Sequence, residues 1–295
     1  MGSGFSTNFP VNNDETPASC SHLPPKQLGG LGDLPENCLA MVLDHFDPPE
    51  ICKLAHVNRA FYRASCADVL WESKLPENYG VLVKKLLKVY EYDCRLSKKD
   101  IYARLCRPVR ISSGTKEVWS EKRRGGICML VSWKGMKITG IHDRRYWAHI
   151  STLQSRFQTI AYLRQIWWLE VEGHVDFYFP TGIYSLFFRL HLGKPSQGQN
   201  QHSSSNNQEI HGWTINPVQF KFSISDGQNA MSKHFLNKQG KWLCYHVGDF
   251  HVKESYEPTK IKFSMTQIDC THQKGGLSLD SVLICPCGTK THGIV

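Results

Sequence analysis

The sequence predicts an α+β protein, with a small N-terminal helical domain followed by a larger antiparallel β-sandwich. Apolar residues recur at the helical period of about 3.6 between residues 34 and 71, and at every second position in segments after Pro108. The 295 residues, 41% of them hydrophobic, are enough for two ordinary domains. We therefore expect two cores, one formed by helices and one by sheets.

Residues 1–32 are rich in Gly, Ser, Asn and Pro and contain too few clustered apolar groups to form a core. We predict a disordered arm. Its first six residues match the N-myristoylation pattern, with Gly2 at the position that is acylated and Ser6 at the position that requires Ser or Thr. Gly2 is therefore a candidate lipidation site, although a single acyl chain holds a protein only marginally at a membrane.

Residues 33–76 predict three brief helices. Pro35 suits the first turn of the first helix, Asp47 and Glu50 form a cap for the second, and Asn58 can cap the third. The apolar face of the first helix consists of Leu39, Val42, Leu43 and Phe46. A unit this small buries little surface, so we expect it to pack against a partner.

Residues 77–117 predict a helical linker. Its first helix has an apolar face made of Tyr79, Leu82, Leu86 and Val89. Ser97 and Asp100 form a capping box for a second helix that carries Ile101 and Leu105.

Residues 118–290 predict the β-sandwich. Apolar residues alternate with polar ones from Trp167 to Phe179, which is typical of a half-buried strand. The same alternation marks strands at residues 184–190, 218–224, 261–265 and 277–284. Residues 193–212 are expected to form a mobile loop. Trp167 and Trp168 face opposite sides of such a strand, so at most one lies in the core, and Trp168 is expected to be structural.

Charge is unevenly distributed along the chain. Residues 33–75 contain seven acidic and four basic side chains, whereas residues 84–145 contain seventeen basic and six acidic ones, a local net charge of +11. Such a segment can attract nucleic acid or an anionic membrane. The longest basic run is only Lys122-Arg123-Arg124. We therefore favour a solvated basic surface and expect no nucleic-acid partner.

The eleven cysteines lack the spacing of a disulfide framework. We expect reduced thiols and a cytoplasmic or nuclear location, because the sequence shows no secretory signal and no run of roughly 18 apolar residues. Cys285 and Cys287, with His292 nearby, resemble half of a zinc site, but a tetrahedral site needs four ligands. We predict no metal site.

Residues 34 to 75 resemble the F-box. The shared features are a leucine-proline start, an apolar helix, a proline-bearing second turn, a valine-plus-polar step before an aromatic helix, and a terminal leucine-tryptophan. The matching residues are Leu34, Pro35, Glu36, Leu39, Val42, Leu43, Phe46, Ile51, Leu54, Val57, Asn58, Phe61, Leu70 and Trp71. An ordinary three-helix core that uses the same apolar positions is the alternative.

In the F-box family these apolar groups dock a Skp adaptor, which joins the receptor to a cullin scaffold and a RING subunit. The resemblance implies that helix-face side chains fill a groove of the adaptor. The residues expected in this contact are Leu34, Pro35, Glu36, Leu39, Leu43, Phe46, Ile51, Leu54, Val57 and Phe61.

Residues 118 to 288 resemble the phloem protein 2, or Nictaba-type, lectins, whose domain is a jelly-roll-like β-sandwich. The matching segments are Arg145-Tyr146-Trp147, Ser155-Arg-Phe157, Trp168-Leu169-Glu170-Val171, Gly212-Trp213, Gly240-Lys-Trp242 and Gly276-Leu-Ser-Leu-Asp280. Plant proteins that join an F-box to such a domain are a known class, so the two resemblances agree.

The lectin resemblance implies binding of N-acetylglucosamine oligomers or N-glycan cores, with two tryptophans stacked on the sugar. Trp147 matches the second tryptophan, with Arg145 and Tyr146 beside it. Gly140 stands where the first is expected, which removes half of the aromatic platform. Two alternatives stay open: Trp147 is a core or rim residue, or Trp133 substitutes for the absent tryptophan.

No catalytic motif is present: the sequence contains no G-x-S-x-G elbow, no P-loop and no H-E-x-x-H. Cys128 and Cys244 lie in apolar strand patterns, where a thiol is expected to pack inertly. We expect a non-catalytic adaptor without a cofactor.

Together, the resemblances predict a substrate-receptor subunit of a Skp–cullin–F-box ubiquitin ligase, in which the β-sandwich recruits a protein or glycoprotein target. A carbohydrate-binding lectin that acts without ubiquitination is the alternative. A nucleic-acid-binding module is a further rival, and its binding would weaken steeply with salt.

Overall fold

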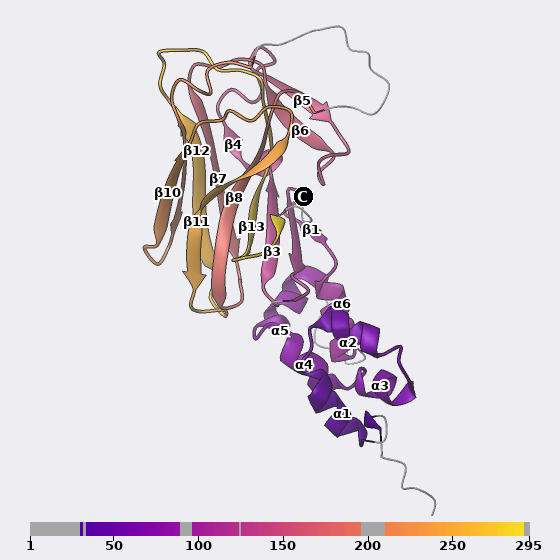
Figure 1. The fold of residues 1–295 in the computed structure, drawn as a ribbon. Coiled ribbons are helices and arrows are strands. Elements are labelled where there is room, and N and C mark those ends of the chain that lie inside the picture. Colours follow the sequence, from indigo (N-terminus) through magenta and orange to yellow (C-terminus); the bar gives the residue numbers. More distant parts are fainter. Residues whose placement is uncertain (1–29, 32–33, 89–95, 124, 196–209, 292–295) are drawn as a thin grey trace, which may run out of the picture.

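The fold consists of a helical unit at one end of an elongated β-sandwich (Figure 1). The structure is a computed structural model that describes residues 30–31, 34–88, 96–123, 125–195 and 210–291. The predicted order, helices first and then an antiparallel β domain of two sheets, is confirmed. Gly2, nearly all of the predicted arm and most of the predicted loop at 193–212 lie outside the described residues.

The first helices are short and begin where the sequence supplies caps. Asn58 Oδ1 accepts a hydrogen bond from the Phe61 amide at 2.9 Å, and Glu50 accepts one from the Asp47 amide at 3.2 Å. Pro35 lies just before the first helix rather than in its first turn. The bounds are α1 Glu36–Leu43, α2 Pro48–Leu54, α3 Arg59–Ala64 and α4 Asp68–Lys74.

The next helices connect this unit to the sandwich. Ser97 Oγ accepts a hydrogen bond from the Asp100 amide at 3.1 Å and thereby caps the last of them, as predicted. Val89, the last residue of the predicted apolar face, lies outside the described residues. The bounds are α5 Tyr79–Leu82, the π-helical turn η2 Val83–Leu87, and α6 Lys98–Leu105.

A compact apolar core holds the helices together. Trp71 of α4 is buried, and its Nε1 donates a hydrogen bond to the Ser65 carbonyl at 2.7 Å. Its ring lies 5.0 Å from that of Tyr102 on α6. The terminal leucine-tryptophan of the sequence pattern therefore fastens α4 to α6. The other fully buried apolar residues of α1, α2 and α4 are Leu39, Leu43, Ile51 and Leu70.

The strands of the sandwich form one eight-stranded and one five-stranded sheet within the described residues. The first sheet contains β1 Val109–Ile111, β2 Lys116–Ser120, β3 Ile127–Ser132, β5 Trp147–Ser151, β6 Thr159–Leu163, β8 Gly182–Leu192, β11 Trp242–Val252 and β13 Leu277–Pro286. The second contains β4 Lys137–Ile138, β7 Leu169–Phe177, β9 Val218–Ile224, β10 Asn229–His234 and β12 Thr259–Gln267. The short helix η3, Trp133–Gly135, follows β3.

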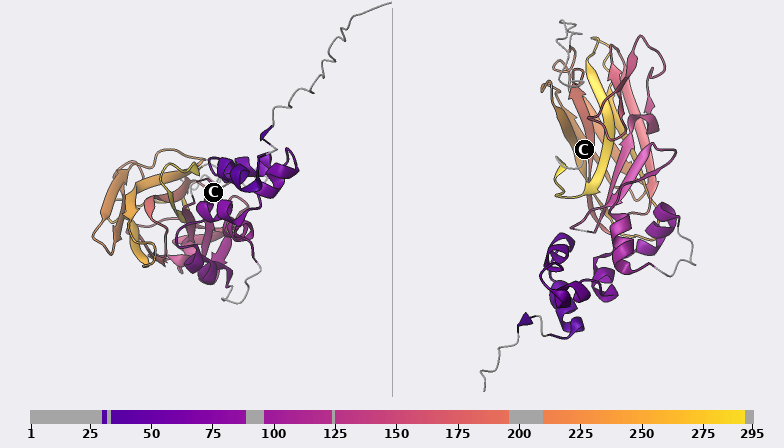
Figure 2. Two further views of the ribbon diagram at one scale, coloured as in Figure 1. Left: turned by 90° about the horizontal axis from the view of Figure 1, so that it is seen from below. Right: turned by 90° about the vertical axis from the view of Figure 1, so that its right-hand side faces the viewer.

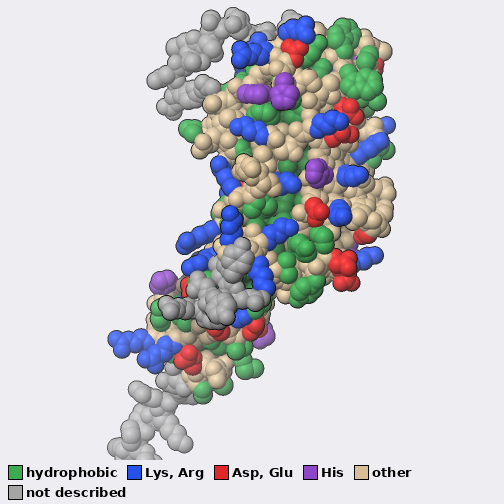
Figure 3. Space-filling model, turned by 180° about the vertical axis from the view of Figure 1, so that it is seen from behind, with side chains coloured by type: hydrophobic (Ala, Val, Ile, Leu, Met, Phe, Trp, Pro, Cys, Tyr) green, Lys and Arg blue, Asp and Glu red, His purple; other side chains and the backbone are tan. Residues whose placement is uncertain are grey.

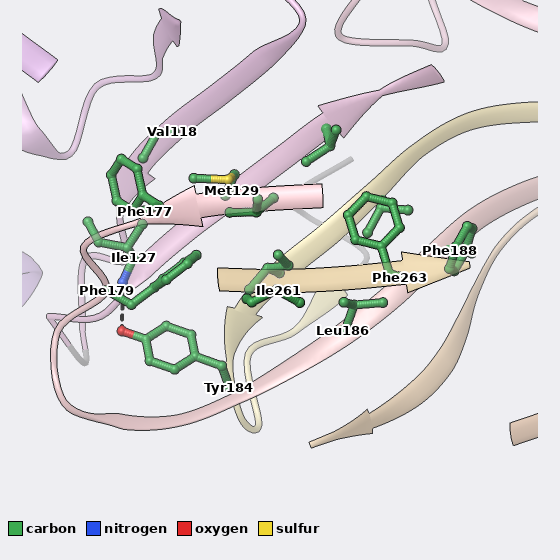
Figure 4. Close-up of a cluster of buried hydrophobic side chains, with 14 of the residues drawn as sticks. Val118, Ile127, Met129, Phe177, Phe179, Tyr184, Leu186, Phe188, Ile261 and Phe263 are labelled. Carbon is green, nitrogen blue, oxygen red and sulfur yellow. Dashed lines mark hydrogen bonds between the residues drawn. The ribbon is translucent and has the colours of Figure 1, made fainter. Parts of the chain in front are cut away.

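The core of the sandwich lies between the inner faces of the two sheets (Figure 4). Phe263 from the second sheet meets Phe188 from the first, with ring centres 5.9 Å apart, and Phe177 from the second sheet lies beside Ile127 and Met129 from the first. The Tyr184 hydroxyl accepts a hydrogen bond from the Ile127 amide at 3.5 Å, drawn as a dashed line in Figure 4, and donates one to the Pro180 carbonyl at 3.1 Å. The polar end of this tyrosine is therefore satisfied inside the core.

Each of the five predicted strand segments forms a strand, β7, β8, β9, β12 and β13. The strand expected from Trp167 begins only at Leu169, because Trp167 and Trp168 form a bend. In addition, β1 and β2 begin at Val109 and Lys116, within the segment expected to be a helical linker. Periodicity does not detect such strands well, because β1 has only three residues and four of the five residues of β2 are buried, so neither shows an alternation of buried and exposed positions.

Two residues at the start of α5 fix the helices to the sandwich. Asn78 is buried, and its Nδ2 donates hydrogen bonds to the Ser255 carbonyl at 2.8 Å and the Tyr178 carbonyl at 3.4 Å. Glu77 Oε1 accepts the Thr181 amide at 3.1 Å. These contacts reach both the β7–β8 and the β11–β12 connections, so the helical unit is held at one end of the sandwich, as the views in Figure 2 also show.

In the described part of the chain, we find no helix of the length and apolar character needed to cross a membrane.

Candidate functional site

The ten residues predicted to contact an adaptor differ in burial. Five are exposed, namely Leu34, Pro35, Glu36, Phe46 and Val57. Two are half-buried, Leu54 and Phe61. Three are fully buried with 0% exposure, Leu39, Leu43 and Ile51. In the chain without a partner, these three side chains have no exposed surface and form the core beneath the exposed ones. Contact of the ten residues with an adaptor stays a prediction.

Helix α1 exposes two apolar residues that were not among the predicted contacts. Met41 is 71% exposed and Val42 is 37% exposed. Val42 was expected to share a face with Leu39 and Leu43, yet it points away from that core. The sequence contains a signal for this arrangement: residues 39–43 are all apolar, so an eight-residue helix carries apolar side chains on two faces. One face serves the core and the other is free for a partner.

The exposed apolar residues of α1 and of the turns beside it define what we call the docking face: Leu34, Met41, Val42, Phe46 and Val57. Scattered exposed apolar side chains are normal on a protein surface, but several within one small unit are typical of an interaction site. This unit has the character expected of a domain that packs against a partner.

The indole rings of Trp147 and Trp133 are not available as sugar platforms. Trp147 is 2% exposed, and its Nε1 donates to the Thr139 carbonyl at 2.9 Å. Trp133 is also buried, with its Nε1 bonded to the Thr159 carbonyl at 3.1 Å and its ring 4.5 Å from that of His149. Of the roles left open for Trp147, its burial favours core packing over stacking on a sugar, since a sugar needs an exposed ring face.

Arg145 and Tyr146, predicted beside Trp147, do reach the surface. Arg145 pairs with Asp143 at 2.7 Å, and its guanidinium lies 5.5 Å from the centre of the Tyr146 ring. Hydrogen bonds from Arg145 hold the pKa of the Asp143 carboxyl below its ordinary value. Gly140 packs against the same ring: it has φ +70°, and a Cβ at this position would lie 2.9 Å from Tyr146 Cδ2. A tryptophan here would meet both backbone strain and the Tyr146 ring.

Trp167 and Trp168 are the exposed tryptophans of this region, at 50% and 45% exposure. The expectation that Trp168 is a structural residue of a strand is wrong, because the chain bends before β7. Lys274 holds the bend: its buried Nζ donates hydrogen bonds to the Trp167 carbonyl and, at 2.8 Å, to the Asp269 carbonyl. Burial lowers the pKa of this lysine from its ordinary value.

These residues lie at one end of the sandwich. The Arg164 amide donates to the Tyr146 carbonyl at 2.7 Å, and the pairing of Leu169 with Gln267 brings Trp168 beside the exposed Ile268. We call this surface, made of Tyr146, Trp167, Trp168 and Ile268, the far end. It is opposite the helical unit, which contacts the other ends of β7 and β12 (Figure 1).

Basic side chains follow two patterns on the face shown in Figure 3. Lys and Arg are dispersed among acidic and uncharged residues over much of the sandwich, and several lie together where the sandwich meets the helical unit. The dispersed part is typical of the solvated basic surface that we favoured from the sequence.

Comparison with known proteins decides the family. The phloem protein 2 family model matches residues 126–286, and an F-box-like model matches residues 31–75. The chain belongs to the phloem protein 2 family. It is 54% identical to the F-box protein PP2-A13 of Arabidopsis thaliana over 87% of this chain and 88% of the relative. It is also 49% identical to the F-box protein PP2-A12 of the same plant, over 95% of this chain and 96% of the relative.

Three of the sequence segments that this chain shares with phloem protein 2 lectins meet at a buried ion pair. Arg189 Nη1 lies 2.9 Å from Asp280 Oδ2, and both side chains are almost fully buried. Ser155 Oγ donates to Asp280 Oδ1 at 2.5 Å, and the Arg189 guanidinium lies 4.2 Å from the centre of the Trp242 ring. Three separate sequence motifs, those with Ser155, Trp242 and Asp280, therefore form one structural cluster.

Three cysteines in the strands of the sandwich have thiols whose pKa is raised. Burial raises the pKa of the Cys128 thiol, and raises that of Cys285 to about 12. Cys244 is shifted upward as well, for the same reason. All three are free, and such thiols are poor nucleophiles at neutral pH. Where the chain is described, no cluster of His, Cys, Asp and Glu could hold a metal ion, and His292 lies outside that part.

Proposed function

We propose that this protein is a substrate-receptor subunit of a Skp–cullin–F-box ubiquitin ligase. The observation that carries the proposal is the docking face: a short F-box-like helix that buries one apolar side in its own core and exposes Met41 and Val42 on the other. Side chains of this kind fit a groove on an adaptor. Membership of a family whose relatives are named F-box proteins supports the same reading.

In this proposal the far end of the sandwich recruits the target. Tryptophan and tyrosine are enriched at the energetic centres of protein interfaces, and Trp167, Trp168 and Tyr146 bring both residue types to this end. The target is a protein or a glycoprotein. Its lysines would be held near ubiquitin that is activated on other subunits, so the chain contributes local concentration rather than chemistry.

The connection between the two surfaces suits this role. Asn78 and Glu77 bind the helical unit to two separate loops of the sandwich, so the docking face and the far end keep one relative orientation. A receptor that holds its target at a fixed distance from the ligase needs such a junction.

A second candidate is carbohydrate binding by the sandwich, and the exposure of Trp167 and Trp168 favours it. Exposed indole faces stack on the C–H surface of sugars, and Arg145 offers hydrogen-bond donors at the same end. N-acetylglucosamine oligomers are the ligand to test, on a glycan array. In this reading a Trp168→Ala substitution abolishes the array signal, whereas Trp147→Phe retains it because that ring is buried.

The experiment that tests adaptor docking is capture of the adaptor and cullin from plant extract by the full-length protein. We expect a double substitution, Leu34→Ala with Pro35→Ala, to lose both partners. The matched control is Met231→Ala, which also removes an exposed apolar group but lies on β10 of the sandwich. Undiminished capture by the double variant would refute the docking proposal. A glycan signal without any adaptor capture would favour the lectin.

A further inference from the structure

A cavity of about 380 Å³ lies where the F-box-like helices meet the rest of the chain. Its walls come from α2, α4 and α6 and from the turn between β2 and β3. Volumes of a few hundred cubic ångströms are typical of small-molecule sites. The lining residues are Pro48, Pro49, Cys52, Trp71, Lys99, Tyr102, Ala103, Cys106, Arg107 and Lys122. We call this cavity the α2–α6 pocket.

The walls of the pocket are apolar and contain two aromatic rings whose polar atoms are already bonded. The Nε1 of Trp71 donates to the Ser65 carbonyl at 2.7 Å, and the Tyr102 hydroxyl donates to the Lys122 carbonyl at 2.7 Å. Cys106 is half-buried in the same wall, and burial raises the pKa of its thiol. The aromatic walls therefore suit a flat, apolar body that needs no hydrogen bond from them.

The pocket also carries three cations and no acidic lining residue. Lys99 Nζ lies 5.7 Å from the centre of the Trp71 ring, and its hydrogen-bond contacts are a hydroxyl and a thiol at 3.5 Å. Within the described residues, none of the three cations, Lys99, Arg107 and Lys122, forms an ion pair with a carboxylate. The carboxylate of Glu121, next to Lys122, lies close enough to add to burial in raising the pKa of Tyr102 and Cys106, but it does not line the pocket. Three positive groups against this one carboxylate favour an anionic ligand.

We propose that the α2–α6 pocket binds a small organic anion, a carboxylate or sulfonate on a planar apolar body. The body packs against Trp71 and Tyr102, and the anionic group pairs with Lys99, Arg107 and Lys122. A ligand in this place touches the F-box-like helices, α6 and the sandwich at once. It therefore stabilises their joint arrangement by a free energy that grows with the logarithm of the ligand concentration above Kd. The site does not depend on adaptor docking or on glycan binding.

The probe for the test is naphthalene-2-carboxylate, with naphthalene-2-carboxamide as the neutral analogue of the same shape. We expect calorimetry on the full-length protein to show binding of the carboxylate and about tenfold weaker binding of the amide. A Lys99→Gln, Lys122→Gln double variant should lose about the same factor. The matched control is Arg104→Gln, which removes a charge from the same helix outside the pocket.

Cysteine alkylation locates the ligand without relying on a variant that has to fold. Cys52 lines the pocket and is exposed, whereas Cys38 is exposed but lies outside it. We expect the carboxylate to slow the reaction of Cys52 with iodoacetamide while Cys38 reacts at an unchanged rate. The proposal is overturned by any of three results: no carboxylate binding up to about 1 mM, equal affinity for the amide, or no protection of Cys52.

Discussion

The two exposed residues of α1 allow adaptor docking to be separated from folding. We consider the double substitution Met41→Gln with Val42→Thr, which replaces each apolar side chain by a polar one of similar size. Met41 is 71% exposed and Val42 is 37% exposed, so neither contributes much to the core. Glutamine is also a good helix former. We therefore expect the variant to fold with nearly unchanged stability.

The expected loss of affinity follows from the surface that a partner can still cover. Full burial of a large apolar side chain contributes about 1.5 to 3 kcal/mol. Scaled by the exposed fractions, Met41 contributes about 1 to 2 kcal/mol and Val42 about 0.5 to 1 kcal/mol on docking. Their joint loss corresponds to a rise in Kd of roughly 10-fold to 100-fold.

The assay is calorimetric titration of the purified protein with a Skp-type adaptor, accompanied by thermal unfolding. Two controls bracket the result. Met231→Gln removes an exposed methionine of the sandwich and should leave the Kd unchanged, whereas Leu39→Ala should lower the unfolding free energy of the helical unit by about 2 to 5 kcal/mol because Leu39 is buried. A Kd within twofold of the wild type for the Met41, Val42 variant would refute the assignment of the docking face.

Three further predictions concern the sandwich and its junction. Asp280→Asn leaves Arg189 buried without a counter-ion. We therefore expect denaturant titration to show a free energy of unfolding lower by about 3 to 5 kcal/mol. A decrease below about 1 kcal/mol would contradict the stabilising role of the ion pair. Asn78→Ala removes two hydrogen bonds between the helical unit and the sandwich. Small-angle scattering should then show a broader distribution of interdomain distances, while the affinity for the adaptor is retained. An unchanged scattering profile would contradict the role of Asn78 in fixing the orientation of the two units. Burial lowers the pKa of His191, so the unfolded chain takes up a proton that the folded chain resists. Protonation of His191 therefore does not reduce the free energy of unfolding above about pH 6.5, and that free energy falls as the pH drops from there through the lowered pKa of the folded state. The melting temperature of a His191→Gln variant should therefore depend less on pH below about pH 6.5 than that of the wild type. An unchanged slope of melting temperature against pH would refute the role of His191.

Local sequence signals predicted the elements well, because the groups that decide them are close in the chain. Asn58 and Ser97 cap helices whose amide partners lie three residues away. Strands β7, β9 and β12 follow from strict alternation, since each has one face toward the core and one toward solvent. In these cases a short window contains all the information that is needed.

The choice of face and the position of the tryptophans depend on groups far away in the chain. Helix α1 is apolar on two sides, so only packing against α3 and α4 determines that Leu39 is buried and Met41 is not. The bend at Trp167 and Trp168 depends on Lys274, more than a hundred residues later, whose ammonium group binds a carbonyl of the bend. No periodicity in the segment itself indicates that contact.

The arrangement of the two surfaces gives the sandwich a mechanical role in the proposed function. Strand β8 alone contains eleven residues, so the far end lies about 35 Å beyond the junction. Held by Asn78 and Glu77 at that distance, a target samples a small volume, and its lysines meet the activated ubiquitin often. If the junction swings freely, the same target spreads over a much larger volume and transfer slows although both binding surfaces are intact. Ubiquitination by an Asn78→Ala receptor is therefore expected to slow without any loss of adaptor or target affinity, an effect that a model of two independent binding modules does not produce.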